Sequence, residues 1–169
     1  MAGLLQKAIE VAVQAHRRGE DPPGEPYIVH PIRVMLAVSP NDDAHQDEAL
    51  RCVAILHDTL ERGGLAPGDL IKAGMPRRVV RAVRLLTHED SVSYADYVVR
   101  LKPDALARAV KIADLLDNAE LRRVTFRPAK AKKDVPRVVR YAASYKFLTD
   151  QISEAEYRML MKHGERRTG

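Results

Sequence analysis

Residues 53–61 read VAILHDTLE, an apolar run that ends in a histidine, an aspartate and, slightly later, a glutamate. The spacing predicts a helix in which apolar side chains lie three, four and seven positions before His57, on the same face. An ionisable side chain on a core face is costly to bury unless it is paired, neutral or bound to a metal. Asp58 is turned about 100° from His57, so both can approach one ion, and Glu61 is expected one turn beyond His57.

A second apolar stretch, residues 109–118, carries Lys111, Asp114 and Asn118 in a similar setting. Two apolar helices that each present an inward carboxylate favour a divalent cation. His30, at the expected start of another helix, would add an imidazole. Two His and two Asp suit Mn, Fe or Zn and differ from a Cys-rich structural zinc site. The pattern alone leaves open a surface or capping role for the His-Asp pair.

The rest of the chain is dominated by the helical period, and its prolines and glycines divide it into segments. We expect an all-α fold, a compact bundle of about seven to nine helices. Residues 1–162 are expected to form one domain and residues 163–169 a flexible tail. The predicted helices cover residues 3–18, 30–38, 46–61, 67–73, 76–86, 93–102, 103–118 and 134–161.

The composition is that of a globular protein, because 46% of the 169 residues are hydrophobic and 30% are charged. No apolar run approaches the roughly 18 residues of a membrane helix, and the N-terminus lacks the layout of a secretory signal. A cytoplasmic location is therefore expected, and the single Cys52 should be a core residue rather than a nucleophile. A net charge of +5 permits an anionic partner.

Several further segments occur in an order that is more specific than one His-Asp pair. They are Ala15-His16, GEPYIVHP at 24–31, VAILHDTLE at 53–61, Leu86-Thr87 and VKIADLLDN at 110–118. Over about residues 4–150 the chain resembles the HD superfamily, specifically the hydrolase domain of bacterial alarmone (guanosine tetraphosphate) hydrolases and their small stand-alone relatives.

This resemblance implies a divalent metal ion, with Mn²⁺ as the first choice. The implied ligands are His30, His57, Asp58 and Asp114. Glu61 falls where a carboxylate orients or deprotonates the attacking water, and Asn118 falls where the family contacts the nucleotide. The implied reaction is metal-assisted attack of water on phosphorus.

The sequence departs from the family pattern at two positions. Glu61 is followed by Arg62 where relatives usually carry an aspartate, and Asp21 aligns with a basic residue that flanks the guanine base. Arg62 could hold a substrate phosphate as a bidentate donor, or it could mark weakened catalysis. The leading hypothesis is an Mn-type phosphohydrolase that cleaves phosphate or pyrophosphate from a small nucleotide. Glu61 and Arg62 would be catalytic, and Asn118, Lys111 and Arg62 would contact the substrate.

Two other functions are consistent with the residues. A catalytically weakened sensor of metal and nucleotide would keep the ligands but lose turnover through Arg62. A nucleic-acid-binding protein would use residues 122–140, which hold eight Lys or Arg and one Asp. No recognised nucleic-acid-binding module accompanies that charge, so nucleic acid is the less expected partner. Oligomer formation is left open by the pattern.

Several other histidines and tyrosines are expected to pack the fold or to lie in solvent. His16 is expected to be a hydrogen-bonded core histidine, and His88 to be exposed in a loop. Tyr27 is expected to pack its loop rather than to take part in chemistry. Tyr94 and Tyr97 are expected to pack the sixth helix, although the resemblance places aromatic residues there near the substrate.

Overall fold

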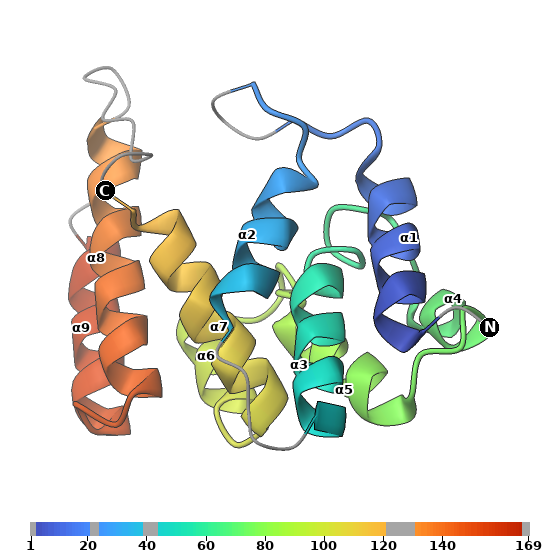
Figure 1. Ribbon diagram of the computed structural model, residues 1–169. Helices are drawn as coiled ribbons and strands as arrows, with labels where there is room; N and C mark the ends of the chain where they lie inside the picture. Colours follow the sequence, from blue (N-terminus) through green and yellow to red (C-terminus); the bar gives the residue numbers. More distant parts are fainter. Residues whose placement is uncertain (1–2, 21–23, 39–43, 121–130, 167–169) are drawn as a thin grey trace.

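The computed structural model describes residues 3–20, 24–38, 44–120 and 131–166, and within these ranges the chain forms nine helices and no β-strand (Figure 1). The helices are α1 (Leu4–His16), α2 (Val29–Ala37), α3 (Ala44–Leu56), α4 (Pro67–Lys72), α5 (Arg77–Leu86), α6 (Tyr94–Leu101), α7 (Ala105–Asn118), α8 (Ala131–Leu148) and α9 (Glu154–Arg166). The predicted all-α class and the number of helices are confirmed. No described helix has the length and apolar character needed to cross a membrane.

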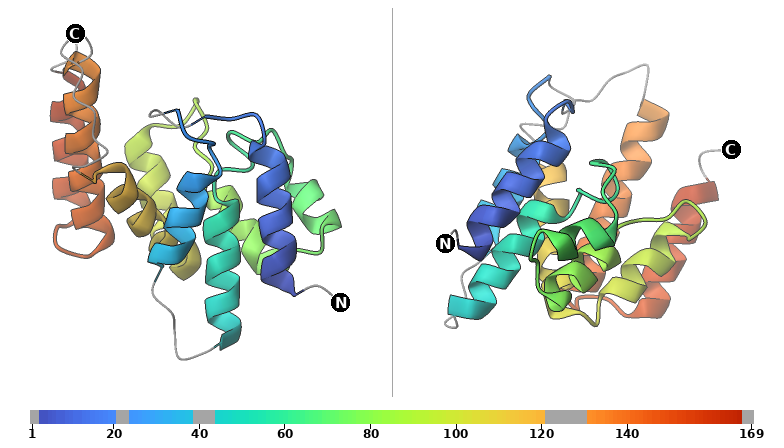
Figure 2. Two further views of the ribbon diagram at one scale, coloured as in Figure 1. Left: turned by 45° about the horizontal axis from the view of Figure 1, so that its top comes forward. Right: turned by 90° about the vertical axis from the view of Figure 1, so that its right-hand side faces the viewer.

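Helix α3 lies at the centre of the packing, against α1, α2, α5 and α7 (Figures 1 and 2). Residues 52–56 in its last turns have no exposed surface. Burial on all sides is the reason that this stretch is apolar at every position rather than along one stripe. The His57-Asp58 pair therefore follows directly on the most buried segment of the chain.

The single cysteine belongs to this buried segment. Cys52 has no exposed surface, and burial raises the pKa of its thiol to about 12. Because the thiolate is the nucleophilic form, this cysteine is unreactive at neutral pH. The expected role as a core residue is confirmed.

The third helix ends earlier than predicted, at Leu56. The backbone N–H and the hydroxyl of Thr59 both donate to the Leu56 carbonyl, at 3.0 and 2.7 Å, and this tightens the chain into turns. Gly63 is needed where these turns press on α1, because a Cβ there would lie 2.6 Å from the Thr59 carbonyl and 2.7 Å from an alanine side chain. His57 and Glu61 consequently lie on turns and not on one face of a helix.

The single final helix predicted over residues 134–161 is wrong. Two helices, α8 and α9, stand side by side at one end of the molecule, with α8 packed against α7 (Figures 1 and 2). The break contains Asp150 at a φ of 58°. Ser153 then caps α9 reciprocally with Glu156, since each backbone N–H donates to the other's side chain, at 2.8 and 3.3 Å.

Candidate metal centre

His30 points its imidazole from α2 into the protein and is only 4% exposed. Its Nδ1 lies 2.8 Å from Asp117 Oδ2, and its Nε2 lies 3.3 Å from Asp114 Oδ1. Burial alone would lower the pKa of this imidazole, but the hydrogen bonds with Asp114 and Asp117 outweigh burial and raise the pKa to about 9. The ring is therefore held in one orientation, with Nε2 directed at the candidate site.

His57 is buried just beyond the end of α3. Its Nδ1 lies 2.8 Å from the Ala54 carbonyl, which fixes the ring. Its Nε2 has no hydrogen-bond partner among the described residues, although Asp58 Oδ2 is 3.4 Å away. Burial would lower the pKa of His57, but the charges of Asp58 and Asp114 raise it. A buried nitrogen without a protein hydrogen bond is the kind of donor that a metal ion accepts.

Asp114 supplies a carboxylate from α7 and is 6% exposed. Its Oδ2 lies 2.8 Å from Lys111 Nζ, and its Oδ1 accepts a hydrogen bond of 2.5 Å from the Asn118 amide. The same Oδ1 lies 3.3 Å from His30 Nε2 and 3.9 Å from His57 Nε2. Burial would raise the pKa of this carboxyl group, but Lys111 and the two imidazoles hold it far below its usual range. Asp114 is therefore ionised.

Asp58 borders the same point. The possible ligand atoms of His30, His57 and Asp114 all lie within 4.8 Å of one another. Asp58 Oδ2 lies 3.4 Å from His57 Nε2 and 3.8 Å from His30 Nε2. It also accepts a short hydrogen bond from the Tyr27 hydroxyl, so Tyr27 does more than pack its loop as expected. Burial, together with the charge of Asp58, raises the pKa of Tyr27 and keeps its hydroxyl protonated.

Of the four ligands predicted from the sequence, His30, His57 and Asp114 form one cluster, from α2, the turn after α3, and α7. Asp58 is not part of that cluster but lies within 4 Å of both imidazoles. Two imidazole nitrogens and two carboxylate oxygens form a mixed donor set that suits a divalent metal ion. The raised pKa values of both imidazoles indicate that the surroundings stabilise positive charge. The residues present therefore fit a metal ion.

Asp117 and Arg33 lie on the side of His30 that faces away from the candidate ion, and neither was predicted from the sequence to have a role. Asp117 Oδ1 lies 2.7 Å from Arg33 Nε, while its Oδ2 lies 3.2 Å from Arg33 Nη2 as well as 2.8 Å from His30. A carboxylate on the distal nitrogen of a ligating histidine is the usual outer-shell arrangement of metal sites. The signal in the sequence was an aspartate three positions after Asp114, although its partner on α2 could not be read from it.

A cavity of about 220 Å³ opens beside these residues. It is lined by the four candidate ligands, by Glu61, Arg62, Lys111 and Asn118, and by Tyr27, Leu86, His88, Tyr94, Tyr97, Arg137, Arg140 and Tyr141. Every candidate catalytic or substrate-binding residue predicted from the sequence therefore reaches this cavity. Glu61 Oε2 accepts a hydrogen bond of 3.1 Å from the His88 backbone N–H. Arg62 has 59% of its side chain exposed and lies 5.2 Å from the centre of the Tyr27 ring.

His88 is half-buried in the cavity wall, so the expectation of an exposed histidine is wrong. Its Nε2 lies 2.8 Å from the Val92 carbonyl, and its ring contacts Tyr97 and Tyr94 at centroid distances of 5.0 and 5.8 Å. These contacts fold the loop before α6 onto the two tyrosines. Both tyrosines line the cavity, as the resemblance implied, and the Tyr94 hydroxyl is buried without a hydrogen-bond partner among the described residues.

His16 occupies the core, with 3% of its surface exposed. Its ring lies 4.9 Å from the ring of Tyr27, and burial lowers its pKa. The hydrogen bond that we expected is not found at Nε2, which has no partner among the described residues.

Some expectations concern residues outside the described part of the chain. Asp21 and most of the basic segment, including residues 122–130, belong to this group. Arg137 and Arg140 of the basic segment are described and line the cavity. The Arg140 guanidinium lies 4.9 Å from the centre of the Tyr94 ring.

Comparisons with known proteins give relatives that are named as guanosine-3′,5′-bis(diphosphate) 3′-pyrophosphohydrolases or as GTP pyrophosphokinases. No family model matches the chain. A guanosine-3′,5′-bis(diphosphate) 3′-pyrophosphohydrolase from Aquifex aeolicus is 31% identical over 137 residues, which is 76% of this chain and 19% of that protein. The GTP pyrophosphokinase rsh from Brucella melitensis is 30% identical over 125 residues, 68% of this chain and 16% of that protein. The chain therefore spans less than a fifth of the length of these two relatives.

A shorter relative is covered much more fully. The guanosine-3′,5′-bis(diphosphate) 3′-pyrophosphohydrolase MESH1 from Danio rerio is 32% identical over 122 residues, 68% of this chain and 67% of that protein. A solved structure of a metazoan ortholog of SpoT, described as hydrolysing ppGpp, covers 100% of this chain and 97% of its own with a TM-score of 0.61. At 21% identity that structure shows the fold. The chain belongs to the family of HD-type guanosine-3′,5′-bis(diphosphate) 3′-pyrophosphohydrolases.

Proposed function

We propose that this protein is a metal-dependent phosphohydrolase that acts on a small phosphorylated nucleotide. The observation that carries the proposal is the convergence of His30 Nε2 and His57 Nε2 on the Asp114 carboxylate, with the His57 nitrogen lacking a partner among the described residues. Perturbed ionisable groups that surround a cavity are typical of catalytic sites. Membership of a pyrophosphohydrolase family supports the same class of reaction.

We propose that His30, His57, Asp58 and Asp114 hold one divalent ion, and that Mn²⁺ is the preferred one. Imidazole and carboxylate donors together suit Mn²⁺, whereas sites that select soft ions are rich in cysteine. When bound, the ion would act as a Lewis acid that makes water a stronger nucleophile and offsets charge on the phosphoryl oxygens. The Asp117 carboxylate would keep His30 Nε2 directed at the ion.

Glu61 is proposed to accept the proton of the attacking water. Its Oε2 is held by the His88 N–H in the wall of the cavity that Asp58 also lines. A carboxylate fixed by one hydrogen bond keeps further lone pairs for a water molecule. Proton acceptance by a positioned side chain typically contributes about 10²–10⁴-fold to a rate.

Arg62, Lys111 and Asn118 are proposed to engage the anionic substrate. Arg62 lines the cavity with 59% of its side chain exposed and its Nε 3.8 Å from Asp58 Oδ2, so the other nitrogens of its planar fork can turn towards a phosphate. Lys111 is held by Asp114 and adds positive charge to the wall. The Asn118 amide nitrogen donates to Asp114, which leaves its carbonyl oxygen for the nucleotide.

Guanosine 3′,5′-bis(diphosphate) is the first candidate substrate, because the relatives from Aquifex aeolicus and Danio rerio are named for its hydrolysis. The resemblance aligns Arg62 with an aspartate of the family pattern and Asp21 with a basic residue that flanks the guanine base. We therefore propose a wider substrate range, in which a nicotinamide dinucleotide phosphate is a second candidate. A cytoplasmic location is also proposed for this protein, because its single cysteine fits a reducing compartment.

The test is to incubate metal-free protein with Mn²⁺ and a panel of phosphorylated nucleotides that includes guanosine tetraphosphate and NADPH. Released phosphate and pyrophosphate are measured separately. We expect Mn²⁺-dependent release that disappears in the His57→Ala/Asp58→Ala variant. No release from any compound, with Mn²⁺ bound, would favour a metal and nucleotide sensor instead. In that case Arg62→Asp, which restores the acid usual in the family, is the variant in which turnover should return.

The role of Glu61 has its own test. Glu61→Gln should lower kcat by about 10²–10⁴-fold while the affinity for Mn²⁺ stays the same, because Glu61 is not among the proposed ligands. Glu10→Gln is the matched control, since it removes the same charge from the exposed face of α1. A kcat for Glu61→Gln within about threefold of the control would contradict the assignment.

A further inference from the structure

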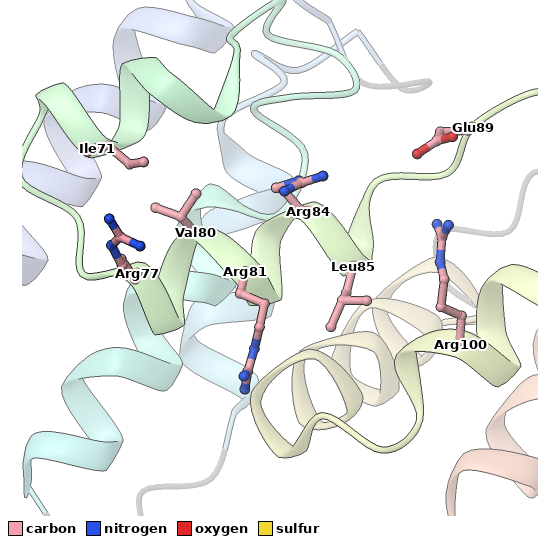
Figure 3. A pocket seen from close by; sticks show the side chains of 8 residues that line it. All are labelled: Ile71, Arg77, Val80, Arg81, Arg84, Leu85, Glu89 and Arg100. Carbon is pink, nitrogen blue, oxygen red and sulfur yellow. The ribbon is translucent and has the colours of Figure 1, made fainter.

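A second hollow, a groove of about 640 Å³, runs along α5 (Figure 3). Arg77, Arg81 and Arg84 reach it from α5, and Arg100 reaches it from α6. None of the residues described as lining this groove also lines the cavity of the metal centre. The groove is therefore a separate feature, and the proposed hydrolysis does not use it.

The pattern of α5 explains why arginines gather on one side. Its buried face consists of Val79, Val80, Ala82, Val83 and Leu86. Arg77, Arg81 and Arg84 stand at positions i, i+4 and i+7, which places them together on the outer face. Like charges at these spacings destabilise a helix. Local stability therefore gives no reason for the stripe.

Most of this charge is not neutralised within the protein. Of the four arginines that line the groove, only Arg81 has an acidic partner among the described residues. That partner is Asp104, whose Oδ2 lies 2.8 Å from Arg81 Nη2. Arg77, Arg84 and Arg100 form no ion pair with any residue of the described chain. Their guanidinium groups are exposed and remain available to an external anion.

The spacing and the floor of the groove define the ligand. At 1.5 Å per residue, Arg77 and Arg84 are about 10 Å apart along α5, which is too far for both to hold one phosphate without bending inward. Two anionic groups at separate positions match this spacing better. Val80 is 5% exposed and Leu85 half-buried, so they form an apolar floor between the arginines. Glu89, at the end near Arg100 in Figure 3, offers an acceptor for an N–H or O–H group.

We propose that this groove binds a nucleotide that carries phosphate groups at two separate positions on its sugar. The arginines take the phosphates as bidentate donors, the base lies on the apolar floor, and Glu89 accepts a hydrogen bond from the base or the ribose. The volume is within the range of about 300–1,000 Å³ found for small-molecule sites. An acidic peptide would meet the arginines equally well but would leave Glu89 facing like charge.

The test uses the full chain in EDTA, which removes the divalent ion and therefore stops turnover. Guanosine 3′,5′-bis(diphosphate) is titrated in by calorimetry at low and at moderate salt. The groove variant is Arg77→Gln/Arg84→Gln/Arg100→Gln, with Arg81 kept because it holds Asp104, the N-cap of α7. The matched control, Arg17→Gln/Arg18→Gln/Lys146→Gln, removes the same charge from exposed positions elsewhere.

We expect one nucleotide per chain, bound more weakly as salt rises, with affinity reduced at least about 10-fold in the groove variant and less than about twofold in the control. The His57→Ala/Asp58→Ala variant should bind like the native protein. Thermal melts check the fold, and Arg100→Gln alone, on α6, should weaken binding in a chain with α5 intact.

Four results would overturn the proposal, the fourth from a parallel titration with hexaglutamate. The first is no binding at low salt, and the second is an equal loss in the groove variant and the control, which would indicate non-specific attraction. The third is binding that survives the groove variant but disappears in His57→Ala/Asp58→Ala. Tighter binding of hexaglutamate than of the nucleotide would assign the groove to an acidic protein segment instead. Since turnover is not measured, failure here leaves the proposed hydrolase untouched.

Discussion

Asp117→Asn separates the outer carboxylate of the metal centre from the ligands themselves. The substitution keeps the size of the side chain but removes the charge that lies 2.8 Å from His30 Nδ1 and 2.7 Å from Arg33 Nε. The Asp117 side chain is only 8% exposed, so water cannot replace the lost interaction well. His30 would keep its place in α2 but lose the partner that sets its tautomer and orientation.

The expected loss of metal affinity can be worked out from the typical effect of an outer-shell carboxylate and from the energy of a hydrogen bond to a charged group, and the two values agree. Loss of an outer-shell carboxylate typically weakens metal binding by about 10–100-fold, which corresponds to about 1.4–2.7 kcal/mol. A hydrogen bond to a charged group is worth about 1.5–3 kcal/mol. We therefore expect the Kd for Mn²⁺ to rise by about 10–100-fold. At saturating Mn²⁺, the metal-induced rise in Tm should be smaller by about 3–10 °C in a chain of this size.

The assay is calorimetric titration of metal-free protein with Mn²⁺, followed by thermal melts with and without the ion. Glu10→Gln again serves as the control for a lost charge on an exposed surface. A Kd for Asp117→Asn within about twofold of the native value would contradict a role of Asp117 in metal binding. It would mean that the Asp117 carboxylate does not govern how His30 meets the ion.

Three further expectations concern pH, the thiol and the packing of a turn. The pKa of His30 is raised from 6.5 to about 9, so in EDTA its contribution to stability should be complete below pH 6.5 and lost as the pH rises through 9. Without EDTA, the affinity for Mn²⁺ should rise over the same window because protons cease to compete for the imidazole. Denaturant melts check the first expectation and Mn²⁺ titrations the second, each at pH 6, 8 and 10. Cys52 should react with a thiol reagent only after denaturation, and fast labelling of the native protein would contradict its burial. Gly63→Ala should lower the free energy of unfolding by about 1–3 kcal/mol, because the added Cβ would meet the Thr59 carbonyl. Gly68→Ala is the control, and it should be neutral or slightly stabilising because the space around Gly68 is open. Equal urea midpoints for the two variants would contradict the expected clash at Gly63.

The sequence was most informative where chemistry and burial coincide. His57 and Asp58 directly follow a fully buried apolar run, and Asp114 lies in a second apolar stretch. All three residues could therefore be singled out from the order of residues in the chain. His30 could be added because the family motif fixes its place. Each of these residues is marked by its own neighbours in the chain, which is the information that periodicity contains.

What the sequence did not reveal depends on contacts between distant segments. Asp117 reaches His30 only because α7 packs against α2, and no pattern within α7 specifies that neighbour. His88 was placed in solvent because the loop that contains it has no period, whereas two tyrosines of α6 draw it into the cavity wall.

The helix ends show a different kind of error. The run through residue 61 favours a continued helix, yet Thr59 competes for the Leu56 carbonyl with both its hydroxyl and its N–H, and propensity does not include such competition. The start of α9, in contrast, could have been predicted, because Ser153 and Glu156 form a capping-box signature that is visible in the sequence.

The most direct test of the central claim is one titration that follows metal occupancy and hydrolysis together. Metal-free protein at a concentration well above the Kd receives Mn²⁺ in steps, and bound metal and the initial rate of pyrophosphate release from guanosine tetraphosphate are measured at each step. We predict that both rise in parallel and stop at one ion per chain, and that His57→Ala/Asp58→Ala abolishes both. A rate that does not follow occupancy, or one that persists in that variant, would contradict a single ion held by His30, His57, Asp58 and Asp114.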